Sequence, residues 1–142
     1  MLSDGWAKVQ GKMMVTLVAL GLISLIWGVM GLAMVVAPSS WNGWVRRSFL
    51  DPLRRFILIQ GLMLAGLVLI LGATGHQGRW LWVAVGALAV AKALALLGLS
   101  DSGREAWLAA CERAPVPAHR LAGVVIVALA TLLAIDTLRG SQ

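Results

Sequence analysis

Four long apolar runs constrain the fold of this chain more than any other feature of its sequence. They span residues 13–38, 56–74, 80–99 and 121–138. The first two contain no ionisable side chain, and the last two contain one each, Lys92 and Asp136. A helix needs about 17 to 25 apolar residues to cross a hydrocarbon core about 30 Å thick. The sequence therefore predicts an all-α integral membrane protein with four transmembrane helices.

The composition argues against a soluble domain. Hydrophobic residues make up 60% of the chain, and charged residues 13%, whereas about 25% is usual in soluble proteins. The formal net charge is +6, but the basic residues cluster near the ends of the apolar runs and not along one exposed face. We therefore expect membrane lipids as partners and no nucleic acid.

The two halves of the chain have a similar order of features. In each half, an apolar run is followed by a loop with tryptophan, arginine and proline and then by a second run, and Trp44 and Trp107 occupy comparable places. The sequence thus predicts a single membrane domain, residues 1–142, built of two tandem helical hairpins, residues 1–75 and 76–142.

Each of the two long loops is predicted to contain a short interfacial helix. Ser39 or Ser40 is a candidate cap for the first, and Ser100 or Ser102 for the second. Anchoring in the membrane interface is one interpretation of their side chains, and docking of the tryptophans onto a partner subunit is the other. The predicted anchors are Trp41, Trp44, Trp107, Arg46, Arg47, Arg54 and Arg55.

The distribution of lysine and arginine predicts the orientation in the membrane. The two long loops carry seven of these residues, and the opposite side carries four. Because basic loops stay in the cytoplasm, both termini are expected outside. The first apolar run is longer than the core of a signal peptide, so it is expected to remain as a helix.

Small residues recur at helical spacing and predict faces for close helix packing. On the first run they are Gly21, Ser24, Gly28 and Gly31, and on the second Gly61 and Ala65. On the third they are Ala84, Ala87, Ala91, Ala95 and Gly98. These faces would either close the four helices on one another or meet other subunits.

Lys92 is the main polar candidate within the membrane, where an ionisable residue is a functional candidate by default. Its side chain is expected to lean toward the helix N-terminus, away from the nearer surface. Gln60 is predicted as its best polar neighbour in the chain. The alternatives are a structural lysine bound to Gln60, backbone carbonyls or lipid phosphate, a contact with another subunit or a cofactor, and a role in transport.

No residue cluster predicts catalysis, a metal site or a cofactor. Cys111 is the only cysteine, so a disulfide within the chain is excluded. His76 and His119 are expected as solvated loop residues on opposite sides of the membrane, where they could not share one metal. Trp27 is expected to be a packing residue, with a pigment contact as the other interpretation.

The first half also resembles a known family. Pro38, Trp41 and the segment Leu-Asp-Pro-Leu-Arg-Arg-Phe at residues 50–56 resemble the YjeT-like small bacterial inner-membrane proteins, over about residues 20–72. That family consists of two-helix chains with a Pro-x-x-Trp loop. The resemblance implies a bacterial inner membrane and supplies no chemistry.

The function favoured by these features is a non-catalytic structural or accessory subunit of a larger membrane complex, with other membrane-protein subunits as partners. We do not expect an enzyme. The competing hypothesis is a small homo-oligomeric transporter or channel that uses Lys92.

Overall fold

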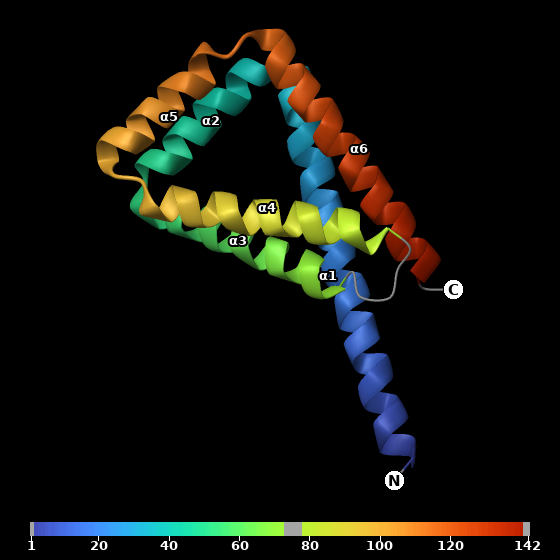
Figure 1. Ribbon diagram of the computed structural model, residues 1–142. Coiled ribbons are helices and arrows are strands. Elements are labelled where there is room, and N and C mark those ends of the chain that lie inside the picture. Colours follow the sequence, from blue (N-terminus) through green and yellow to red (C-terminus); the bar gives the residue numbers. More distant parts are fainter. Residues whose placement is uncertain (1, 73–77, 141–142) are drawn as a thin grey trace.

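The computed structural model describes residues 2–72 and 78–140, which form six helices (Figure 1). They are α1 (Leu2–Val36), α2 (Pro38–Leu50), α3 (Pro52–Gly72), α4 (Arg79–Gly98), α5 (Asp101–Arg113) and α6 (Val116–Gly140). Of these, α1, α3, α4 and α6 are long and apolar enough to cross a membrane. The prediction of an all-α membrane protein with four spanning helices is thus confirmed.

Short helices occupy both long loops, and their ends follow local chemistry. Ser100 caps α5, its hydroxyl oxygen accepting the backbone N–H of Gly103 at 3.3 Å. The prediction that Ser39 or Ser40 caps α2 is wrong. Pro38 holds the first helical position and Ala37 the cap, without a side-chain hydrogen bond. Proline suits this position because its fixed φ is helical and its missing N–H would be unpaired there.

The four spanning helices associate as two pairs, α1 with α6 and α3 with α4. In Figure 1 these pairs form two sides of a triangle, and α2 and α5, lying side by side, form the third. The pairs meet at a core cluster of Leu20, Leu69, Trp82 and Leu133, which takes one residue from each spanning helix. From that corner they separate toward α2 and α5.

This pairing differs from the one suggested by the repeat. Each spanning helix packs mainly on a helix of the other half of the chain, because the largest interfaces join α1 to α6 and α3 to α4. The tandem hairpin arrangement is therefore not confirmed. The order of long helix, short helix and long helix does recur in each half.

Each pair is held by two glycines at which the backbones touch. A Cβ atom added to Gly31 would lie 2.8 Å from the carbonyl oxygen of Gly123, and one added to Gly86 would lie 2.6 Å from that of Gly66. Any side chain larger than hydrogen would push the backbones apart. Such contact is how helices associate in lipid, where burying apolar surface gains little because lipid is equally apolar.

Candidate functional site

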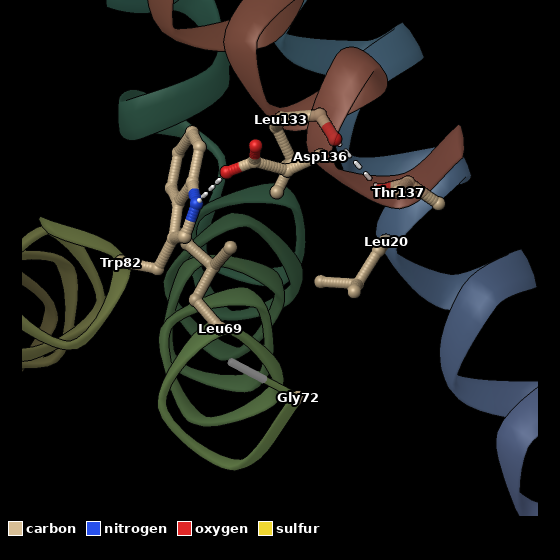
Figure 2. Close-up of a pocket in the computed structure, with 7 residues that line it drawn as sticks. All are labelled: Leu20, Leu69, Gly72, Trp82, Leu133, Asp136 and Thr137. Carbon is tan, nitrogen blue, oxygen red and sulfur yellow. Dashed lines mark hydrogen bonds between the residues drawn. The ribbon is translucent and has the colours of Figure 1, made fainter. Parts of the chain in front are cut away.

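A hydrogen bond between Trp82 and Asp136 links the two helix pairs at their meeting corner (Figure 2). The indole N–H of Trp82, on α4, donates to Oδ2 of Asp136, on α6, at 2.6 Å. Trp82 is only 2% exposed, and Asp136 is half-buried. A carboxyl group within an apolar run is costly to bury without a hydrogen-bond partner. The bond from the Trp82 indole satisfies one oxygen of Asp136.

The same corner contains a small, partly open cavity of about 10 Å³. The residues that line it are drawn in Figure 2: Leu20, Leu69, Gly72, Trp82, Leu133, Asp136 and Thr137. The hydroxyl of Thr137 donates to the carbonyl of Leu133 at 2.7 Å, within α6. Since about 10 to 15 Å³ is the least space that holds one water, the cavity is too small for a substrate.

Sequence reasoning missed this corner. Asp136 was noted only as the acid of the last apolar run. Asp136 is the only acidic residue in the four apolar runs, and Trp82 lies near the start of the preceding run. Successive spanning helices run in opposite directions, so the start of one and the end of the next fall on the same side of the membrane, and an intramembrane acid calls for a donor there. That signal could have found the pair.

Lys92 lies exposed on α4, and no hydrogen bond joins it to Gln60 in the described part of the chain. Gln60 is half-buried on α3. Burial raises the pKa of the Cys111 thiol on α5, and the charge of Lys92 opposes this by lowering it.

The predicted small-residue faces are divided between packed and exposed positions. In α1, Ser24 and Gly31 are buried, and the Ser24 hydroxyl donates to the carbonyl of Ala130 at 2.7 Å. A Cβ on Gly28 would lie 3.9 Å from that of Ala130. Gly21 is exposed and would meet nothing within 4 Å. The α1 face that contacts α6 therefore excludes Gly21.

On the α3/α4 pair, Gly61 and the predicted face of α4 point away from the contact, and Ala65 lies at its edge. Gly61 is exposed, with nothing within 4 Å of an added Cβ, and Ala65 is half-buried beside the buried Gly66. On α4, the contact with α3 is made by the opposite side of the helix. Its buried residues are Trp82, Gly86, Ala89, Ala93 and Leu96. The predicted face, comprising Ala84, Ala87, Ala91, Ala95 and Gly98, is exposed, and we call it the α4 outer face.

Aromatic and charged side chains join α2 to its neighbours. Within α2, Trp41 and Trp44 stack on each other with ring centroids 5.3 Å apart. Phe49 of α2 contacts Trp107 of α5 at the same centroid distance. Arg46 of α2 donates to both carboxylate oxygens of Glu112 on α5, at 2.7 and 2.9 Å, and this hydrogen bond and charge raise the pKa of Arg46.

The remaining predicted anchors make local contacts. Arg47 donates to the carbonyl of Gly43 at 3.1 Å, and Arg54 lies 3.4 Å from a carboxylate oxygen of Asp51. Arg55 is half-buried at the start of α3. Arg47 and Arg54 remain exposed.

The expectation that His119 is a solvated loop residue is wrong. It is 9% exposed in the first turn of α6, with Nδ1 3.4 Å from the carbonyl oxygen of Pro115. His76 lies outside the described residues. Trp27 is half-buried and packs against the core cluster at the corner. Among residues 2–72 and 78–140, no group of three or more His, Cys, Asp or Glu side chains could hold a metal ion.

No protein-family model, curated protein or solved structure matches the chain. The resemblance of residues 20–72 to the YjeT-like proteins stays a prediction.

Proposed function

We propose that this protein is a non-catalytic accessory subunit of a larger membrane-protein complex. The observation that carries the proposal is the α4 outer face, a row of alanine and glycine that stays exposed among residues 2–72 and 78–140. In lipid, small residues let a second helix approach closely and associate through packing. Leucines would serve equally well if this face met only lipid.

The shape of the molecule supports a scaffold in preference to a catalyst. The two helix pairs meet at one corner, and the cavity there is water-sized. The polar groups at the corner, Trp82 and Asp136, are bonded to each other. In the proposed role, the protein presents the outer faces of its helices to neighbouring subunits.

We also propose that α2 and α5 lie in the cytoplasmic interface of a bacterial inner membrane, with both termini outside. The arginine count of the long loops supports the orientation, and the YjeT-like resemblance supports the compartment. In a Cys111→Ser background, a membrane-impermeant maleimide should label Ser3→Cys in intact spheroplasts. Arg46→Cys should react only after permeabilisation. Labelling of Arg46→Cys in sealed spheroplasts would reverse the orientation.

Purification in mild detergent with mass identification tests the proposed function. We expect other membrane polypeptides to co-purify in fixed ratio with the wild-type protein. They should be lost from Ala87→Leu and Ala91→Leu, because leucine on the α4 outer face blocks close approach. Ala128→Leu, the same enlargement at an exposed position of α6, is the control and should retain them. Recovery of this chain alone from native membranes would contradict the proposal.

Lys92 separates this role from the competing one, a homo-oligomeric transporter or channel. Lys92→Met removes the charge and keeps most of the side-chain length. For an accessory subunit, the variant should assemble like the wild type, because Lys92 forms no hydrogen bond with Gln60 and is already exposed. A wild-type ion flux in proteoliposomes that this change abolishes would support a transporter.

A further inference from the structure

Residues 38–55 and 101–120, which we call the base, lie together at one end of the spanning helices. Because α1, α3, α4 and α6 cross in alternating directions, the end of α1, the start of α3, the end of α4 and the start of α6 share one side. α2 and α5 join these ends as the third side of the triangle in Figure 1. This step rests on the proposed location of α2 and α5 in the membrane interface, and it holds for either direction of insertion.

Ion pairs neutralise some arginines of the base and not others. The base contains seven arginines and four acidic residues. Three of each are paired: Arg46 with Glu112, Arg54 with Asp51, and Arg104 with Asp101. The arginines that have no acidic partner within residues 2–72 and 78–140 are Arg47, Arg55, Arg113 and Arg120. With Glu105 as the remaining acid, the unpaired charges of the base are four positive and one negative, a sum of +3.

Two neighbouring arginines of α2 show the difference. Arg46 donates to both carboxylate oxygens of Glu112, at 2.7 and 2.9 Å, and Phe49 also contacts α5. At about 100° per residue, Arg47 lies about 160° around the helix from Phe49, on the side away from α5. The Nε of Arg47 donates to the carbonyl of Gly43. Its terminal nitrogens donate to no other group in the described part of the chain, and the side chain is exposed.

The other unpaired arginines lie at the two ends of the base. Arg55 is half-buried in the first turn of α3. Arg113 is exposed at the end of α5, and Arg120 is exposed near the start of α6. Unpaired positive charge therefore occurs at both places where a helix pair reaches the membrane surface. The anion at that depth is the lipid phosphate, whose oxygens match the N–H groups of a guanidinium.

We propose that the base binds the headgroup phosphates of anionic phospholipids through Arg47, Arg55, Arg113 and Arg120. Anionic lipids attract basic residues at a membrane surface, and the chain supplies no acid to compete for these four. Arg46, Arg54 and Arg104 take no part, because an acid of the chain already neutralises each of them. Of the arginines that the sequence predicts as anchors, only Arg47 and Arg55 therefore hold lipid phosphate.

Spin-labelled lipids in membranes that contain the full chain test the proposal. Labelled phosphatidylglycerol is the anionic probe, and labelled phosphatidylcholine is the neutral one. The wild type should immobilise phosphatidylglycerol in preference. Arg47→Gln and Arg120→Gln should each lower that preference by up to about fivefold, the effect of one basic residue at a charged surface. Higher ionic strength should lower the wild-type preference as well, because salt screens exposed charges.

The ion pairs provide the matched controls. Arg54→Gln combined with Asp51→Asn removes an arginine without changing the net charge, and the lipid preference should stay at the wild-type level. Glu112→Gln releases Arg46 and should raise the preference. A loss in the Arg54→Gln/Asp51→Asn variant as large as in Arg47→Gln would overturn the division between paired and unpaired arginines. A wild type with no preference for phosphatidylglycerol would overturn lipid binding by the base and would leave the proposed accessory role intact.

Discussion

Replacing Gly31 with leucine is expected to separate α1 from α6. An added Cβ would stand 2.8 Å from the carbonyl oxygen of Gly123 and 3.0 Å from the backbone nitrogen of Val127. Neither contact can be relieved by a side-chain rotation, so the helix backbones must move. Overpacking of this kind costs about 1 to 3 kcal/mol, and this site should reach the upper limit because backbone is involved. Reversible unfolding in mixed micelles measures the loss.

The matched control is Gly21→Leu in the same helix. Gly21 is exposed, and an added Cβ would meet nothing within 4 Å. Leucine also forms helix more readily than glycine, by up to about 1 kcal/mol, so this variant should be neutral or slightly more stable. Equal stability of Gly31→Leu and Gly21→Leu would mean that α1 and α6 do not cross at Gly31.

Replacing Trp82 with alanine is expected to release the two helix pairs from each other. Trp82 is 2% exposed, packs against Leu69 and Leu133, and bonds Asp136. Loss of a buried tryptophan side chain costs about 3 to 5 kcal/mol. Spin labels on α6 and α4 should show a wider distribution of distances between the pairs, together with the lower stability.

Trp80→Ala controls for the loss of any tryptophan from this end of α4, since Trp80 is 75% exposed. It should change stability little. Trp82→Phe retains most of the packing and removes the N–H donor, which should cost about 1 kcal/mol. In an Asp136→Leu background that cost should shrink, because the acceptor is gone. If Trp80→Ala lost as much stability as Trp82→Ala, the loss would come from removing a tryptophan at the membrane interface and not from the corner.

Much of the secondary structure could be predicted from the sequence. The spanning helices were predictable because crossing a bilayer requires a long run of apolar side chains. The four runs contain only two charged residues, Lys92 and Asp136, so they remain clearly apolar. Short helices lie at both predicted loop positions, and their place at a membrane interface stays a prediction. Ser100 was a predictable cap because its hydroxyl needs only local backbone geometry.

The candidate site was only partly predictable. Lys92 was visible as a charge in an apolar run, but its exposure on α4 depends on which side of that helix packs against α3. The bond between Trp82 and Asp136 joins residues 54 positions apart on different helix pairs. The burial of His119 likewise depends on how the start of α6 packs.

The sequence by itself determined which segments are helical and which are apolar enough to cross a membrane, because those properties depend on neighbours within a few turns. Only the tertiary structure decided which helices pair and by which faces. On α4, small residues occur on two opposite sides, and the side that packs is the one whose Gly86 lets the backbone touch Gly66. Close packing depends on the matching shape of a second helix, and one helix's sequence does not contain that shape.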